Sequence, residues 1–315
     1  MQTKNILVTG VNGFVGHHLA KELTNHKIGV IGVGSQPQPA AALQPFLLDY
    51  VQCDLTDEAA VDKLPLSKAT AIIHLAAMAS KALSFTKPKE SINSNSNMVI
   101  NLFEAALRQD AHPRFVQVSS GAIYRSDQPM PLTEASELGA DSPYAIGKIL
   151  CEQLCEYYGK RGFEYVILRP FNHTGPGQGL GYLIPDLTSN ALKAGKGGEL
   201  LTGNLSSKRD YSDVRDVVRA YTMIATAEKI PHSIYNVCSG ESHSGEDILR
   251  LITEALYDNE TALTSKVDES KLRPFEPSDI VGDHSLLSED FGWQPQISLE
   301  QTITDYAAWF EKEAH

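Results

Sequence analysis

The 315-residue chain has few cysteines, a deficit of positive charge and no long apolar run. Its four cysteines form no C-x-x-C pair, so we expect reduced thiols in the core. The net charge of −12 argues against nucleic acid and membrane surfaces as partners. No apolar run approaches the length of a membrane span. Residues 1–5 lead directly into an apolar strand without a signal peptide, which predicts a cytoplasmic protein.

Strand and helix patterns alternate through the first half of the chain. Apolar strands are predicted at residues 6–8, 28–33, 51–54, 71–75, 115–119 and 165–168. Helices are predicted between them, from Val15, over 95–109 and over 144–158. This alternation predicts an α/β fold with a Rossmann-type, doubly wound parallel sheet over residues 1–169.

Beyond Pro170 the pattern changes. After a Gly-rich loop, helices are predicted at 184–194, 214–227 and 244–256, a strand at 234–237, and a last helix with a capping box of Ser298 and Gln301. We expect residues 170–315 to form mainly a smaller α/β cap that binds a substrate. The two domains should be interleaved, with returns to the first domain near residues 209–238.

Gly10, Gly13 and Gly16 have the spacing G-x-x-G-x-x-G between the first strand and the first helix. Glycines let the backbone turn tightly and approach a pyrophosphate, and the helix N-terminus supplies N–H donors. The pattern predicts a dinucleotide cofactor, so residues 1–169 are expected to bind NAD(P). A glycine-rich turn without a ligand is the alternative.

The choice between NAD and NADP usually depends on the end of the second strand. Residues 32–36 contain no carboxylate to repel a 2′-phosphate and no arginine to bind one, so NAD and NADP both stay open. Asp54, at the end of the third strand, is placed to accept a hydrogen bond from the adenine amino group. Helix capping is the alternative role for Asp54.

Tyr144 and Lys148 are four residues apart in a predicted helix, so they should share one face. Ser142 is a plausible N-cap, and Pro143 suits the first helical position. A nearby ammonium stabilises a phenolate, so the pKa of Tyr144 should fall from about 10. Such a tyrosine can serve as a general acid or base. The alternative is a surface pair that arose by chance.

Together these features resemble the extended short-chain dehydrogenase/reductase family, also described as the NAD-dependent epimerase/dehydratase family. The resemblance spans nearly the whole chain. Its motifs are Thr9-Gly10-x-x-Gly13-Phe14-x-Gly16, Asp54-Leu55-Thr56-Asp57, His74-Leu75-Ala76-Ala77, Val118-Ser119-Ser120-x-x-x-Tyr124, Tyr144-x-x-x-Lys148 and Phe291-Gly292-Trp293-x-Pro295.

The resemblance implies that Tyr144 is the catalytic acid or base and that Lys148 lowers its pKa and holds the nicotinamide ribose. It also implies that Ser120 hydrogen-bonds the substrate oxygen, where a hydroxyl can stabilise developing charge. The implied cofactor contacts are Gly10, Gly13, Phe14, Val15, Gly16, Asp54, Leu55, Leu75, Ala76, Ala77, Asn95, Tyr144, Lys148 and Pro170. No metal site is implied, and His74 and His173 are interpreted as structural histidines.

Motifs in the second half resemble the nucleotide-sugar enzymes of this family, and especially their GDP-sugar branch. They lie at residues 168–178, 203–216, 235–240 and 272–276. The resemblance implies a nucleotide-diphosphate sugar substrate. The expected substrate contacts are Ser80, Ser120, Asn172, Asn204, Arg209, Arg273 and Glu276. Both arginines are candidate diphosphate ligands, because guanidinium binds phosphate oxygens bidentately, although surface ion pairs would also explain them.

We expect an NAD(P)H-dependent reductase of a 4-keto-6-deoxy nucleotide sugar, such as GDP-4-keto-6-deoxymannose. An NAD-dependent nucleotide-sugar 4-epimerase and a non-enzymatic redox-sensing regulator are the alternatives. A 4,6-dehydratase is disfavoured, because residues 121–123 are neutral where elimination needs an Asp-Glu pair. The resemblance also implies a homodimer that pairs the helices near 95–109 and 144–158. Ile146, Ile149, Leu150 and Leu154 would fill that seam, or else the core of one chain.

Overall fold

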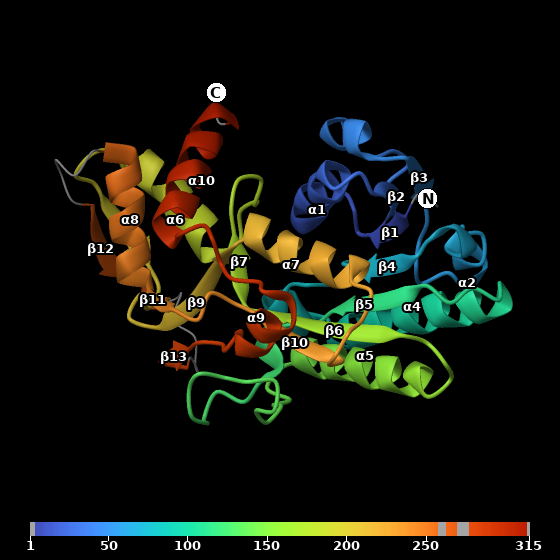
Figure 1. The fold of residues 1–315 in the computed structure, drawn as a ribbon. Helices are drawn as coiled ribbons and strands as arrows, with labels where there is room; N and C mark the ends of the chain where they lie inside the picture. Colours follow the sequence, from blue (N-terminus) through green and yellow to red (C-terminus); the bar gives the residue numbers. More distant parts are fainter. Residues whose placement is uncertain (1–3, 258–262, 270–276, 314–315) are drawn as a thin grey trace.

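The computed structural model describes residues 4–257, 263–269 and 277–313. A large α/β unit is built on a seven-stranded sheet, and a smaller unit that contains the C-terminal helix lies beside it (Figure 1). The α/β class and the Rossmann-type sheet that the sequence predicts are confirmed. We propose that the two units correspond to the predicted NAD(P)-binding and substrate-binding domains.

The seven strands of the central sheet are parallel, in the order β3-β2-β1-β4-β5-β6-β10. They are β1 (Asn5–Thr9), β2 (Gly29–Gly34), β3 (Asp49–Gln52), β4 (Ala71–His74), β5 (Arg114–Val118), β6 (Tyr165–Pro170) and β10 (Ile234–Val237). The strand order reverses between β1 and β4. Doubly wound sheets bind their ligands beyond the carboxyl ends of the strands at such a reversal.

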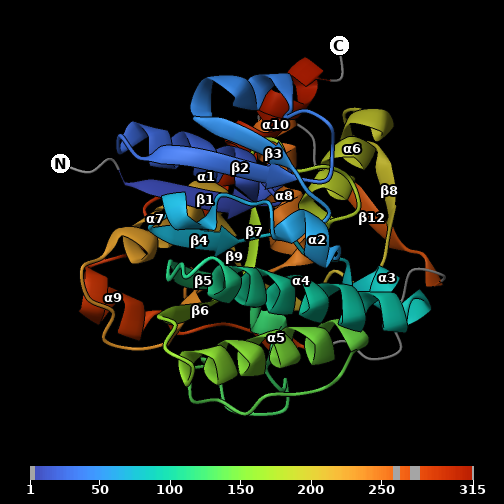
Figure 2. The same ribbon diagram turned by 90° about the vertical axis from the view of Figure 1, so that its right-hand side faces the viewer.

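Helices cover both faces of this sheet (Figure 2). On one face, α1 (Phe14–Asn25) and α7 (Val214–Thr226) bury Leu19, Leu23 and Tyr221. On the other face lie α2 (Glu58–Val61), α4 (Pro88–Arg108) and α5 (Pro143–Gly159). Because both faces are covered, inner strands such as β1 and β4 are buried and rich in apolar residues, whereas the edge strand β3 is more polar.

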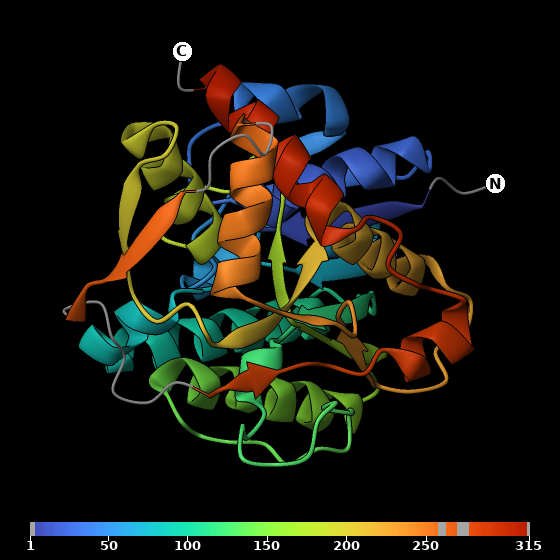
Figure 3. The same ribbon diagram turned by 90° about the vertical axis from the view of Figure 1, so that its left-hand side faces the viewer.

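The smaller unit contains α6 (Leu183–Ala194), α8 (Gly245–Tyr257) and α10 (Leu299–Glu313), which share an apolar core (Figure 3). Its short strands are β7 (Asn172–Thr174), β8 (Glu199–Thr202), β9 (Lys208–Asp213), β11 (Ser242–Ser244), β12 (Thr264–Val267) and β13 (Asp279–Ile280). The other described elements are α3 (Lys81–Thr86), α9 (Ser285–Phe291) and the 3-10 turns η1 (Ala41–Phe46), η2 (Leu66–Lys68) and η3 (Gly121–Ile123).

The chain returns to the central sheet after residue 213. Helix α7 packs on the sheet and β10 pairs with β6, whereas β9 pairs with β7, β11 and β13 of the smaller unit. The helix predicted over 95–109 is wrong at its start, since α4 begins at Pro88. Residues 88–95 are mostly polar and lack apolar periodicity, so the proline at the first helical position was the available signal.

The predicted helix cap and thiols can be followed in the structure. Ser298 Oγ accepts a hydrogen bond from the N–H of Gln301 at 3.2 Å, while the Gln301 side chain donates to Asp305, so half of the capping box forms. The four cysteines are buried and unpaired, as predicted. Burial raises the pKa of the Cys151 thiol to about 11, which keeps it protonated at neutral pH.

Candidate active site

The glycine turn connects β1 to α1 at the point where the strand order reverses. Gly10 has a φ of +67°, and a Cβ at this position would lie 2.9 Å from the backbone of Ala76. A Cβ at Gly16 would overlap the carbonyl oxygen of Val11. Gly13 caps α1 without a side-chain hydrogen bond, so no capping side chain satisfies the first N–H groups of the helix. The turn therefore has the shape and the donors that a diphosphate requires.

Tyr144 and Lys148 lie on the first turns of α5, next to the carboxyl end of β5. Ser142 Oγ accepts from the N–H of Ala145 at 3.1 Å, which confirms the predicted cap. Lys148 Nζ donates to the Val118 carbonyl at 2.7 Å and lies 6.0 Å from the centroid of the Tyr144 ring. Because these side chains are 8% and 5% exposed, they are not a chance surface pair.

Ser119 and Ser120 follow β5 but have different partners. Ser120 Oγ accepts from the N–H of Ala122 at 3.1 Å, so its hydroxyl proton is not used in this bond. The buried Ser119 hydroxyl donates to Glu152 instead. Ser120 can therefore donate a hydrogen bond to a substrate oxygen, whereas Ser119 has a structural partner.

A buried ion pair lies one helical turn beyond Lys148. Glu152 accepts from Arg169 at 2.6 and 3.0 Å, and Arg169 also donates to the hydroxyl of Tyr124 at 2.9 Å. Tyr124 in turn donates to Asn236 at 2.7 Å. Burial lowers the pKa of Arg169, but its bonds to Glu152 outweigh burial and raise it. This network connects α5 to the ends of β5, β6 and β10.

Two further buried polar residues stand beside the loop that follows β4. The Nδ1 atom of His74 lies 2.8 Å from Thr9 Oγ1, which accepts from the N–H of Ala76 at 3.2 Å. Burial, together with the charge of Lys148, lowers the pKa of His74 to about 3, so the ring is neutral. Asn95 Oδ1 accepts from the N–H of Met78 at 2.8 Å, but its buried Nδ2 has no partner. That amide is a donor available to a ligand.

The adenosine side of the predicted site contains Asp54 and the end of β2. Asp54 Oδ1 accepts from the N–H and hydroxyl of Thr56, and these bonds lower the pKa of its carboxyl group. Asp57 caps α2, so the capping alternative for Asp54 is wrong. Next to β2, Asn12 Nδ2 donates to Gln36 Oε1 at 2.9 Å and to the Tyr50 hydroxyl at 3.2 Å.

The remaining predicted cofactor contacts lie close to carboxyl ends of strands or at the start of α1. Leu55 lies shortly after β3, residues 75–77 follow β4, and Pro170 ends β6. Phe14 and Val15 open α1. The structure thus brings residues from four segments of the sequence to the carboxyl edge of the sheet.

The predicted substrate contacts are more dispersed. Asn172 is exposed on β7 and donates to the Asp210 carbonyl at 3.3 Å, and Ser80 Oγ accepts from the N–H of Leu83 at the start of α3. Asn204 Oδ1 accepts from Ser206 within one turn. Arg209 donates to the carbonyls of Lys208 and Pro277 at 2.6 and 2.9 Å. Arg273 and Glu276 lie outside the described residues.

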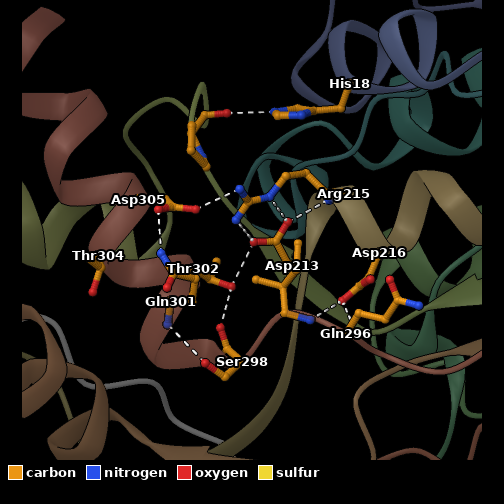
Figure 4. Close-up of polar contacts among 12 residues, drawn as sticks. His18, Asp213, Arg215, Asp216, Gln296, Ser298, Gln301, Thr302, Thr304 and Asp305 are labelled. Atoms are coloured by element: carbon orange, nitrogen blue, oxygen red, sulfur yellow. Dashed lines mark hydrogen bonds and ion pairs between the residues drawn. The ribbon is translucent and has the colours of Figure 1, made fainter. Parts of the chain in front are cut away.

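Sequence reasoning missed a polar junction between α1, α7 and α10 (Figure 4). Asp213 caps α7 and accepts from Arg215 at 2.6 Å and from Thr302 at 2.8 Å. Arg215 also pairs with Asp305 of α10 at 2.7 Å. His18 of α1 contacts the Pro176 carbonyl at 2.7 Å. The Asp213–Arg215 pair lies within the motif at residues 203–216. The sequence did not indicate that these two side chains would bond to each other and to α10.

The described residues 4–257, 263–269 and 277–313 contain neither a metal-binding cluster nor a membrane-spanning helix. No group of three or more His, Cys, Asp or Glu residues there could hold a metal ion. No helix there is long and apolar enough to cross a membrane.

The chain is similar to a known protein family over most of its length. Residues 6–238 match the model of the NAD dependent epimerase/dehydratase family. GDP-6-deoxy-D-mannose reductase of Pseudomonas aeruginosa is 28% identical over 96% of this chain and 95% of its own length. UDP-glucose 4-epimerase of Thermotoga maritima, solved with UDP-glucose, is 27% identical with a TM-score of 0.87, covering 99% and 100% of the two chains.

A structure of RMD from Pseudomonas aeruginosa, complexed with NADPH, is 27% identical with a TM-score of 0.83 over 99% of this chain and 100% of the other. The overall fold, built on the parallel sheet, is shared with both of these solved structures. The chain belongs to the NAD dependent epimerase/dehydratase family and is an NAD(P)-dependent enzyme of the extended short-chain dehydrogenases/reductases.

Proposed function

We propose that this protein reduces a 4-keto-6-deoxy nucleotide sugar to the alcohol with NAD(P)H. The observation that carries the proposal is the similarity to GDP-6-deoxy-D-mannose reductase over 96% of the chain. The site geometry supports it, because Tyr144, Lys148 and Ser120 gather at the carboxyl edge of the sheet next to the glycine turn. The turn between Ser120 and Tyr124 is neutral, which disfavours a dehydratase.

The residues present fit an NAD(P) cofactor. A Cβ at Gly10 or Gly16 would clash with the backbone of Ala76 or Val11, so the tight turn needs glycine at both positions. The start of α1 lacks a capping side chain, and the buried Asn95 Nδ2 lacks a partner. Gly10, Gly13 and Gly16 would hold the diphosphate, and Asp54 would accept from the adenine. When bound, the reduced cofactor supplies a hydride.

Three side chains would handle the carbonyl oxygen that becomes the alcohol. Tyr144 donates the proton from its phenol. Lys148 is held by the Val118 carbonyl at 2.7 Å, and its charge stabilises the phenolate that forms. Ser120 donates a hydrogen bond to the same oxygen while charge develops on it. Tyr144, Lys148 and Ser120 thus each have one role in the reduction. The reduction needs no carboxylate at residues 121–123, unlike the elimination that a dehydratase carries out.

The second candidate is a nucleotide-sugar 4-epimerase, which the similarity to UDP-glucose 4-epimerase favours. The two functions differ in whether the cofactor is consumed. We would mix purified enzyme and NADH or NADPH with GDP-, dTDP- and UDP-linked 4-keto-6-deoxy sugars and follow the nicotinamide absorbance. A reductase consumes one cofactor per sugar. No oxidation with any sugar, together with interconversion of two sugars by bound NAD, would replace the reductase by the epimerase.

We further propose a cytoplasmic location and a homodimer. The four buried, unpaired cysteines suit a reducing compartment. Helices α4 and α5 pack against each other, and Ile146 and Tyr157 are 41% and 53% exposed on α5. Ile149, Leu150 and Leu154 are partly buried, so part of the predicted seam already contacts the chain itself. Sedimentation as a monomer at micromolar concentration would refute the dimer.

A further inference from the structure

Residues 172–178, here termed the strap, connect the glycine turn to the smaller unit. The strap begins with β7 directly after β6 and contains the proposed substrate contact Asn172. Its Gly175 and Gly177 have φ values of +152° and +96°, so the chain bends where it passes α1. Gln178 fastens the bend, because it accepts from the Thr174 hydroxyl at 2.7 Å and donates to the His173 carbonyl at 3.2 Å.

One side of the strap rests on the first turns of α1. The His18 Nε2 atom lies 2.7 Å from the Pro176 carbonyl, and because a carbonyl accepts, the ring nitrogen donates. The His173 ring is stacked on the Phe14 ring, with 6.4 Å between centroids and 9° between planes. Phe14 is the first residue of α1, next to the N–H groups proposed to bind the diphosphate.

The other side of the strap is held by the polar junction and by α10. Thr174 pairs with Asp213, which accepts from Thr302 of α10 (Figure 4). The buried Tyr306 hydroxyl of α10 donates to the Gln178 carbonyl at 3.0 Å. The strap therefore contacts both α1 and α10.

We propose that His18 is a positioning residue that couples cofactor binding at the glycine turn to substrate binding in the smaller unit, by holding the strap against α1. The proposal rests on the proposed function, since it takes the diphosphate of NAD(P) at α1 and a nucleotide-diphosphate sugar beside Asn172. A bound diphosphate fixes the first turn of α1. Through His18 and Phe14 the same event fixes the strap, so the substrate loses less freedom when it binds second.

The test measures coupling without turnover. Dissociation constants of GDP and of UDP are measured by calorimetry, with and without saturating NADP or NAD. In the unmodified protein, the bound cofactor should lower the dissociation constant of the nucleoside diphosphate by about fivefold or more. This is within the usual range of coupling between sites. H18A should lose this difference and change the dissociation constant of the cofactor alone less than twofold.

Two variants separate positioning from general damage. H18Q keeps an N–H donor toward the Pro176 carbonyl and should retain most of the coupling. H26A, on the exposed end of the same helix, is the matched control and should behave as the unmodified protein. Tyr306→Phe removes the hydrogen bond from α10 to the strap and should also weaken the coupling. If H18A fails to fold, Tyr306→Phe replaces it as the test of the coupling.

The outcomes distinguish the two proposals. If GDP, UDP and, in the same assay, dTDP all fail to bind the unmodified protein, the proposed substrate class is wrong. If one binds but the cofactor does not tighten it, or if H18A and Tyr306→Phe keep full coupling, the coupling role of the strap is refuted while the proposed function stands.

Discussion

The Nζ atom of Lys148 donates to the backbone carbonyl of Val118 at 2.7 Å while lying 6.0 Å from the centroid of the Tyr144 ring. One bond thus ties the helix that contains the candidate acid to the last residue of β5, which Ser119 and Ser120 follow. A lysine that would otherwise sample many rotamers is fixed, and two of its three N–H donors stay available for other partners. This contact fixes the Lys148 ammonium beside the ring of Tyr144.

Replacement of the candidate acid tests its role. Tyr144→Phe should lower kcat by about 100-fold or more, because it removes the proton that a positioned general acid supplies. The cofactor dissociation constant should change little, and the melting temperature should stay within a few degrees. Steady-state kinetics and cofactor titration measure both. Tyr157→Phe, on an exposed position of the same helix, is the control and should keep normal activity. Equal loss in both variants would contradict the assignment.

The glycine turn predicts a binding defect. Gly10→Ala places a Cβ 2.9 Å from the Ala76 backbone at a φ of +67°, so the turn must move away from the diphosphate position. We expect loss of measurable NAD(P) binding by fluorescence titration. Gly162→Ala is the control. Gly162 has a φ of +99° but open space around a Cβ, so the substitution should cost about 1 kcal/mol of stability and leave cofactor affinity intact. Tight cofactor binding by Gly10→Ala would show that the diphosphate lies elsewhere.

The buried Glu152–Arg169 pair predicts a stability effect. Glu152→Ala leaves the Arg169 guanidinium buried without its partner, since Arg169 is 3% exposed. We expect the free energy of unfolding to fall by roughly 3 kcal/mol in urea denaturation. Glu156→Ala, one turn later and exposed, should stay within about 0.5 kcal/mol of the unmodified protein. Similar effects of the two substitutions would mean that the ion pair contributes nothing beyond a surface charge.

His74 predicts how stability depends on pH. Burial and the charge of Lys148 lower its pKa to about 3 in the folded state, from an ordinary 6.5. The folded chain therefore takes up this proton only at a lower pH than the unfolded chain does. The contribution of neutral His74 to stability is present above pH 6.5 and is lost as the pH falls toward 3. The slope from this group approaches about 1.4 kcal/mol per pH unit.

Urea denaturation between pH 7 and pH 4 measures that slope. His74→Gln keeps a polar group next to Thr9 but does not titrate, so its unfolding free energy should depend less on pH. His26→Gln, at the exposed C-cap of α1, should show the full slope. An unchanged slope in His74→Gln would assign the acid sensitivity to other groups.

The large unit followed from the sequence because its signals are local. Strands such as β1 and β4 are apolar runs, and Gly10 precedes a helix with apolar side chains on one face. The start of α4 was missed because Ser91 and Asn95 are polar yet buried, through packing that no local pattern reveals. The substrate side was harder still. Arg209, which is predicted to bind phosphate, donates to backbone carbonyls 1 and 68 residues away, and its sequence motif does not indicate the second of these contacts.

His18 illustrates the same limit. Its partner, the Pro176 carbonyl, lies 158 residues away in sequence, and a backbone acceptor leaves no mark in the residue types. The three-dimensional contacts of a side chain decide whether it is free to bind a ligand, and sequence motifs do not report those contacts.

The most direct test of net reduction follows the hydrogen itself. NADPH or NADH with deuterium at the transferable position of nicotinamide C4 is incubated with GDP-4-keto-6-deoxymannose, and the product is analysed by mass spectrometry and NMR. We predict one deuterium on sugar C4 for each cofactor oxidised, and none with Tyr144→Phe. An unlabelled product, or sugar interconversion without cofactor consumption, would contradict the reductase and leave the epimerase as the function of this site.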